Sequence, residues 1–219
     1  MDSLSVVQKL AVWALPVLFA VTLHEVAHGW VARSLGDPTA ARLGRLSLNP
    51  LNHVDPLGTL LIPGLLLAFG GFIFGWAKPV PVDWRNFKHP RRDMAVVAVA
   101  GPLSNLAMAL GWGLVYKYAT ASGATAGLWY GLALMGKAGM VINVSLMVLN
   151  LLPLPPLDGG RVAVGLLPAR AAYRYARIEP YGFLILLLLV ATGALSAMLY
   201  WPYVLSFLGL ARVLGLPLT

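Results

Sequence analysis

The chain has 219 residues, of which 59% are hydrophobic and only 11% are charged, and it contains no cysteine. Soluble domains normally carry about 25% charged residues, so this composition excludes a soluble globular protein and indicates an integral membrane protein. Disulfides and thiolate metal ligands are excluded as well. The net charge of +8 comes from basic residues that cluster between apolar segments, so it favours the positive-inside rule over nucleic-acid binding.

The first predicted membrane helix covers residues 6–35 and contains His24, Glu25 and His28. Residues four apart lie on the same face of a helix, so the two histidines can present their imidazoles to one metal ion. Glu25 can then reach a water molecule beside that ion, as in the H-E-x-x-H pattern of zinc peptidases. His24 lies roughly 14 Å along the helix from Arg33, so the motif is immersed in the membrane, where ionisable groups are costly and usually functional.

Two less regular stretches follow this helix. Residues 42–48 alternate between polar and apolar side chains, which predicts a short β element. Residues 57–74 carry no charge but are interrupted by Pro-Gly and Gly-Gly pairs, so they either span the membrane or re-enter it and return to the same side. We favour the re-entrant alternative, because most basic residues then lie on the side nearest the metal motif.

Three further spans are predicted at residues 94–118, 131–152 and 181–200, and residues 201–219 are predicted to lie at the membrane surface. The expected fold is therefore an all-α membrane protein, a polytopic helical bundle. It has about four full transmembrane helices plus a re-entrant segment and a short β element after the first helix. The charge distribution predicts a multi-pass cell-membrane protein with both termini outside and the metal motif towards the cytoplasm.

A catalytic zinc site needs three protein ligands and one open position. Because cysteine is absent, the third ligand must be a histidine or a carboxylate. Asp158 is favoured, because it follows a proline-rich break at the end of a span and precedes Gly159 and Gly160, where the backbone can turn freely. The other candidates are Asp2, Asp37, His53, Asp55, Asp83, His89, Asp93 and Glu179.

Motifs of one family occur in four stretches of the chain, which are residues 24–28, 74–82, 101–105 and 150–159. Together they resemble the site-2 protease family of intramembrane zinc metalloproteases, in the small branch that carries neither a PDZ nor a CBS domain. The chain would then be a single protease domain, 1–219, with a catalytic core at about 6–165 and C-terminal helices at about 178–219.

The resemblance also implies roles for individual residues. One catalytic Zn²⁺ would be bound by His24, His28 and Asp158, with Glu25 as the catalytic base. Asn150 would help to hold substrate, although a helix-packing amide is the alternative. Asn105 is a further candidate for substrate binding, again with close helix packing as the alternative.

The implied activity is hydrolysis of a peptide bond in or near transmembrane segments of membrane-protein substrates. The expected partners are such substrates and the lipid bilayer, without nucleic acid, and no feature of the sequence sets an oligomeric state. The alternative function is a membrane metal or proton transporter that uses buried His and Asp ligands. Glu25 separates the two hypotheses, because a transporter needs ligands but no general base beside the metal.

Overall fold

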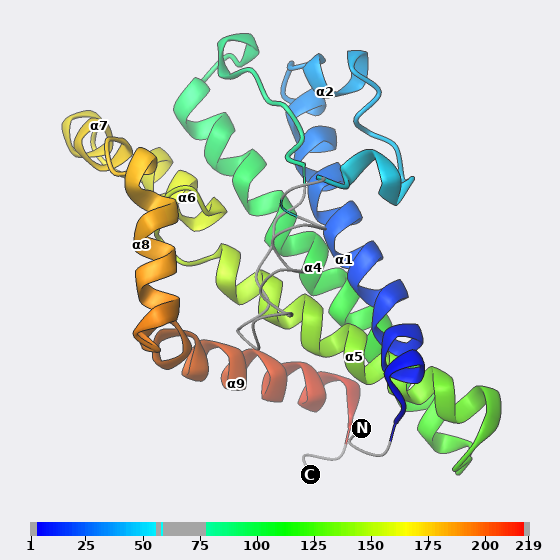
Figure 1. Cartoon of the computed structure of the whole chain (residues 1–219). Helices are drawn as coiled ribbons and strands as arrows, with labels where there is room; N and C mark the ends of the chain where they lie inside the picture. Colours follow the sequence, from blue (N-terminus) through cyan, green and yellow to red (C-terminus); the bar gives the residue numbers. More distant parts are fainter. Residues whose placement is uncertain (1–3, 56–57, 59–77, 217–219) are drawn as a thin grey trace.

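The computed structural model describes residues 4–55, 58 and 78–216, and the regular structure in this part of the chain is helical, without a β-strand (Figure 1). Four long helices are apolar enough to cross a membrane: α1 (Val6–Ser34), α4 (Pro90–Ala121), α5 (Gly127–Asn150) and α9 (Ala194–Leu214). This confirms the prediction of a helical membrane protein with about four spans.

Helix α1 coincides with the predicted first span because both of its ends are capped. Ser5 Oγ accepts a hydrogen bond from the Gln8 N–H at 3.2 Å, and the Ser5 N–H donates to Gln8 Oε1 at 2.9 Å, which forms a capping box. At the other end Gly36 adopts a φ of +110°, and the Asp37 N–H donates to the Ala32 carbonyl at 2.9 Å. The chain therefore turns sharply as it leaves α1.

The prediction of a short β element at residues 42–48 is wrong. The chain forms a short helix, α2 (Thr39–Arg42), and then a turn. Gly44 has a φ of +66°, and the Arg45 N–H donates to the Ala40 carbonyl at 2.9 Å. This is the bond pattern of a glycine-terminated helix end, so the alternation in the sequence comes from a helix cap and not from a strand.

The predicted re-entrant segment, residues 57–74, lies outside the described residues apart from residue 58. On either side of it are two short 3-10 turns, η1 (Pro50–His53) and η3 (Trp84–Asn86). Residues 78–83 have no helical structure and run directly into η3.

Helix α4 is the central helix of the bundle, because it contacts α1, α5 and α9 along its length (Figure 1). It is antiparallel to both α1 and α5. A Cβ added at Gly136 of α5 would lie 2.6 Å from the backbone nitrogen of Tyr116, and one at Gly139 would lie 2.1 Å from the ring of Trp112. These two glycines therefore let α5 approach α4 closely, as small residues do in membrane helix pairs.

The C-terminal third departs from the predicted single span at residues 181–200. Helix α8 (Glu179–Ala191) is only 13 residues long, roughly 20 Å, which is short for a ~30 Å hydrocarbon core. The chain breaks at Gly193, whose φ is +74°, and then forms α9. The stretch predicted to lie at the membrane surface is thus mostly the second half of α9.

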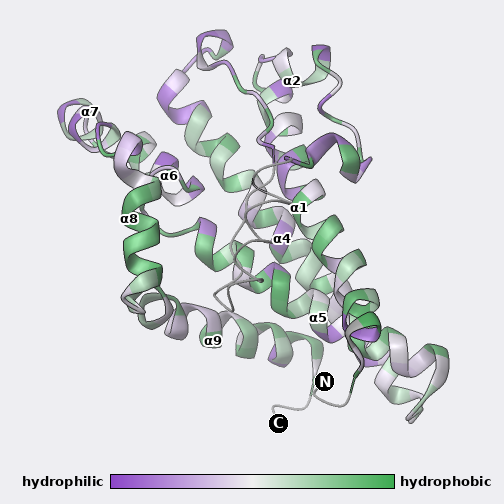
Figure 2. Ribbon diagram, viewed as in Figure 1, coloured by the Kyte–Doolittle hydropathy of each residue, from purple (hydrophilic) through white to green (hydrophobic). Residues whose placement is uncertain are grey.

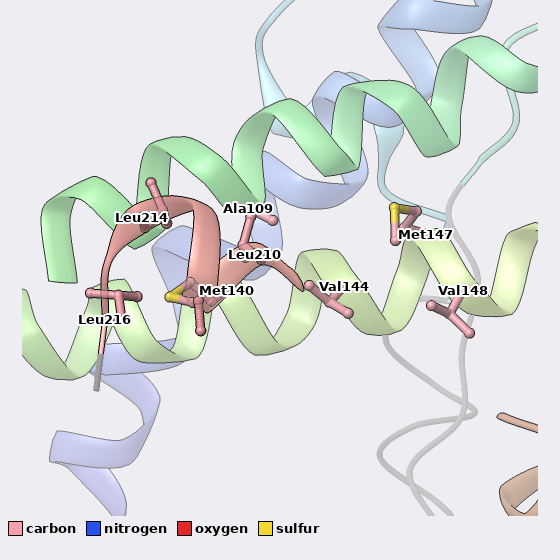
Figure 3. Close-up of a cluster of buried hydrophobic side chains, with 9 residues drawn as sticks. Ala109, Met140, Val144, Met147, Val148, Leu210, Leu214 and Leu216 are labelled. Atoms are coloured by element: carbon pink, nitrogen blue, oxygen red, sulfur yellow. The ribbon is translucent and has the colours of Figure 1, made fainter. Parts of the chain in front are cut away.

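Helix α9 is held against α4 and α5 by a buried apolar cluster (Figure 3). Its members are Ala109, Met140, Val144, Met147, Val148, Leu210, Ala211, Leu214 and Leu216. The Lys117 ammonium adds a polar contact by donating to the Leu214 carbonyl at 2.7 Å. As a result, the end of α9 lies beside the end of α4.

Polar residues gather at one end of the bundle. Figure 2 shows hydrophilic residues around α2, at the start of α4 and on α7 (Ala169–Ala176), whereas α8 is strongly hydrophobic. Helix α6 (Asp158–Leu166) lies at the same end and follows a turn of residues 151–157. The segments that carry the predicted site residues therefore meet near this polar end.

Candidate metal centre

His24 and His28 lie one turn apart on α1 and face each other, with their Nε2 atoms 3.1 Å apart. Both side chains are buried. The other ring nitrogen of each is fixed by α4: Nδ1 of His24 lies 2.6 Å from Asn105 Oδ1, and Nδ1 of His28 lies 2.7 Å from the Val97 carbonyl. Since both of these oxygens can only accept, each Nδ1 carries the proton and each Nε2 presents a lone pair.

Asp158 brings a third donor to this pair from the first residue of α6. Its Oδ2 lies 3.2 Å from His24 Nε2 and 3.3 Å from His28 Nε2. The tight turn behind it depends on the two following glycines. A Cβ at Gly159 would lie 2.3 Å from two backbone carbonyl oxygens, and one at Gly160 would lie 2.4 Å from a proline nitrogen. The sequence Asp-Gly-Gly therefore allows α6 to begin directly against the turn.

The three donors fit a zinc ion. Asp158 Oδ2 is buried and receives no hydrogen bond from the described residues, although two imidazole nitrogens lie beside it. Three potential ligand atoms thus converge, and a cation would satisfy all three together. The separations of 3.1, 3.2 and 3.3 Å match the edge of about 3.3 Å expected between ligand atoms around tetrahedral zinc. His24, His28 and Asp158 therefore form a group that can hold a metal ion.

Two buried amides support His24 from behind. Asn105 has no exposed surface, and its Nδ2 donates to the Ala20 carbonyl at 3.2 Å and to Asn143 Oδ1 at 2.9 Å. Asn143 is equally buried and donates to the Gly139 carbonyl at 2.9 Å. All of these contacts are made within the protein. They favour the helix-packing alternative for Asn105 and, beyond it, a role in orienting His24, over the predicted role in substrate binding.

Glu25 follows His24 on α1 and lies on the side of the helix that meets residues 78–82. Its Oε2 accepts a hydrogen bond from the backbone N–H of Val80 at 2.8 Å. The side chain is only partly buried, unlike the two histidines. Glu25 is thus next to the metal group but outside it, which is the arrangement that a general base requires.

Asn150 is the last residue of α5 and is partly buried. Its Nδ2 donates to the Leu146 carbonyl of its own helix at 3.0 Å. This hydrogen bond does not connect Asn150 to the metal group, and the side chain remains partly exposed. The role of Asn150 in substrate binding therefore stays a prediction.

Three residues shape this site without a role assigned from the sequence: Gly101, Asn143 and Val80. Gly101 and Val80 lie in two of the motif stretches, 101–105 and 74–82. An added Cβ at Gly101 would lie 2.4 Å from His28 Nε2 and 2.6 Å from His24 Nε2. Asn143 had a usable signal, because a polar amide in an apolar span is costly unless it has a partner. Val80 acts through its backbone, and nothing in its side chain indicates this.

The comparisons with known proteins agree with a zinc peptidase. The model of Peptidase family M50 matches residues 114–192. YwhC of Bacillus subtilis, provisionally named a zinc metalloprotease, is 42% identical over 85% of this chain and 82% of its own. Rip2 of Mycolicibacterium smegmatis, named in the same way, is 34% identical over 84% of this chain and 70% of its own. Rip2 of Mycobacterium tuberculosis is 30% identical over 86% of this chain and 71% of its own. No solved structure matches the chain.

Proposed function

Because the chain belongs to Peptidase family M50, the family of the site-2 proteases, we propose that this zinc metalloprotease cleaves membrane-protein substrates in or near their transmembrane segments. The protein is a multi-pass membrane protein, and two of its candidate ligands lie in a membrane helix, α1. A peptide bond that reaches these ligands must therefore enter the protein at the depth of the bilayer, which favours transmembrane substrates over soluble ones.

The proposed roles follow from the geometry of the site. His24, His28 and Asp158 would hold the zinc ion. When bound, zinc would supply Lewis-acid chemistry at the scissile carbonyl and at the attacking water. Glu25 takes a proton from the attacking water and delivers it to the leaving nitrogen, acting first as general base and then as general acid. Asn105 keeps the proton of His24 on Nδ1, so that Nε2 stays available as a ligand.

The substrate must be unwound locally before it is cleaved, because the carbonyls of an intact helix are engaged in its own hydrogen bonds. Asn150 is the proposed contact for the exposed substrate backbone, since its partly buried amide stands at the end of α5, just before the turn that leads to Asp158. The proposed partners are thus transmembrane proteins and the surrounding bilayer.

The proposed orientation places the metal group towards the cytoplasm and both ends of the described chain outside. Most arginines belong to the segments at one end of the bundle, which are α2, the start of α4, α6 and α7 (Figure 1). The positive-inside rule favours the cytoplasmic side for this end.

One observation carries the proposal: three buried ligand atoms lie within 3.3 Å of each other, and the Glu25 carboxylate is on the residue next to one of them. The test measures zinc content and cleavage of a model transmembrane substrate for the purified wild type and for Glu25→Gln. We expect both proteins to hold one zinc ion and only the wild type to cleave. Equal cleavage by both proteins, or zinc transport in liposomes without any cleavage, would overturn the proposal.

A further inference from the structure

The segment that faces Glu25 has an unusual distribution of backbone donors. Residues 78–82 have the sequence Lys-Pro-Val-Pro-Val, and proline has no N–H. Val80 therefore carries the only backbone donor in the run from Pro79 to Pro81. Lys78 and Val80 each precede a proline, which disfavours helical backbone and keeps the segment extended. The run from Pro79 to Pro81 thus has one backbone N–H, carried by an extended backbone of restricted flexibility.

That single N–H is directed at Glu25. It donates to Glu25 Oε2 at 2.8 Å, and Oε1 makes no hydrogen bond to the described residues. The Val80 side chain is buried against the same stretch of α1, because a Cβ added at Gly29 would lie 2.9 Å from its Cγ1. The amide therefore fixes one carboxylate oxygen and leaves the other available.

Both ends of the segment are anchored independently of Glu25. On one side, Arg45 Nη2 donates to the Lys78 carbonyl at 2.8 Å, and the Lys78 N–H donates to the His53 carbonyl at 2.9 Å. On the other side, the Asp83 N–H donates to Asp37 Oδ2 at 2.8 Å. The position of the Val80 N–H is thus set by the protein frame, before any metal or substrate is bound.

We propose that the backbone amide of Val80 is a positioning group for the catalytic base, which it holds in one orientation by fixing Oε2. The inference rests on the proposed role of Glu25. A glutamate side chain has three rotatable bonds, and without this contact it samples orientations in which Oε1 does not face the attacking water. A fixed donor removes that disorder before the reaction begins. Because the donor belongs to the backbone, the function survives changes of the Val80 side chain.

The test replaces the single amide with an ester, by incorporating the α-hydroxy analogue of valine at position 80 in the full-length protein. This change removes the N–H and weakens the Pro79 carbonyl as an acceptor, but that carbonyl accepts only a long contact of 3.4 Å from Arg45 Nη2. We expect kcat to fall about tenfold or more, the size of a lost hydrogen bond to a charged group, while KM and zinc content stay unchanged. The matched control is the same ester at position 82, whose N–H makes no hydrogen bond to the described residues; it should leave kcat unchanged.

Two results would contradict the proposal or its basis. A loss of kcat for the ester at position 82 as large as that at position 80 would assign the effect to the segment in general and overturn the proposal. Glu25→Gln reports on the proposed function. If Glu25→Gln is inactive while the ester at position 80 cleaves like the wild type, the positioning role is wrong and the function stands. If Glu25→Gln cleaves normally, the proposed function itself fails.

Discussion

Gly101 determines how closely α4 can approach the two histidines. It lies on the turn of α4 that faces His24 and His28, and the space where its side chain would be is the space in front of both Nε2 atoms. A metal ion must occupy the same region if these atoms bind it. The absence of a side chain at Gly101 therefore leaves the space beside the two Nε2 atoms free for a metal ion.

Replacing Gly101 by alanine should accordingly remove zinc. The added methyl carbon would lie 2.4 Å from His28 Nε2, so the ligands must move apart or α4 must move away. Zinc content measured by mass spectrometry on the purified protein should fall at least about tenfold, the cost of disturbing the surroundings of a ligand. Gly111→Ala is the matched control, because a Cβ at Gly111 of the same helix would meet nothing within 4 Å. Full zinc content in Gly101→Ala would contradict this account of the site.

The anchors of residues 78–83 show how short elements place a catalytic group. Asp37 is fully buried just after α1, and it accepts hydrogen bonds from the Asp83 N–H at 2.8 Å and from Asn86 Nδ2 at 2.7 Å. It also accepts bonds from the N–H and the hydroxyl of Thr39. Burial alone would raise the pKa of this carboxyl, but these hydrogen bonds outweigh it and lower the pKa below its ordinary value.

A lowered pKa makes the contribution of Asp37 to stability depend on pH. The unfolded chain takes up a proton at about pH 3.9, whereas folded Asp37 resists protonation until a lower pH. The stabilisation is therefore complete above about pH 4 and is lost as the pH falls through the folded pKa. We expect Asp37→Asn to lower the free energy of unfolding by about 1–3 kcal/mol at pH 7, because it places an amide against several donors.

The measurement is thermal unfolding in detergent from pH 3 to pH 8 for the wild type and Asp37→Asn. The difference in melting temperature should be constant above about pH 5 and should narrow below about pH 4. A difference that stays the same at every pH would show that the charge of Asp37 does not contribute.

Helix pairing supplies another prediction at this scale. A Cβ at Gly136 would approach the backbone of Tyr116 to 2.6 Å, and backbone cannot move aside as a flexible side chain can. Gly136→Ala should therefore force α4 and α5 apart and lower the free energy of unfolding by about 1–3 kcal/mol. Gly131→Ala, on the same helix but with nothing within 4 Å of its added Cβ, should leave the melting temperature unchanged or raise it slightly. Equal melting temperatures for the two variants would contradict close packing at Gly136.

The comparison of sequence and structure is most instructive where helices end. The predicted secondary structure is wrong at residues 42–48 and at residues 181–200. In both places a glycine with positive φ ends a helix: Gly44 follows α2, and Gly193 separates α8 from α9. Each lies in an apolar or alternating pattern that predicts continuous structure. Hydropathy measures how well a segment fits the membrane, whereas a helix end depends on one residue and its backbone bonds.

The metal group could be anticipated because its chemistry is restrictive. With cysteine excluded, zinc leaves few choices for a third ligand, and Asp158 lies within 3.3 Å of both histidines although 130 positions separate it from His28. The supporting contacts of Asn143 and Val80 could not be anticipated in the same way. They depend on which faces of α1, α4 and α5 meet, and many side-chain patterns are compatible with more than one packing.

At the scale of the whole molecule, antiparallel packing determines which segments share a side of the membrane. The start of α1 lies near the end of α4, because Ala20 and His24 contact Asn105 whereas His28 contacts Val97. The end of α9 lies there too, through Lys117 and Leu214. The turn after α1 is at the opposite end, together with α2 and α7 (Figure 1). The two ends of the described chain therefore lie at one end of the bundle and the arginine-rich segments at the other.

This arrangement is testable because the chain contains no cysteine, so a single introduced thiol can be labelled alone. Ser5 and Ser122 lie at one end of the bundle and Ser34 at the other, and all three are exposed. In intact cells a membrane-impermeant maleimide should label Ser5→Cys and Ser122→Cys. Ser34→Cys should react only after permeabilisation, because the proposed orientation places the arginine-rich end in the cytoplasm. Each variant should retain proteolytic activity, which verifies its fold. The reverse labelling pattern would invert the proposed orientation, and labelling of Ser34→Cys and Ser122→Cys from the same side would show that α4 does not cross the membrane as its length and composition predict.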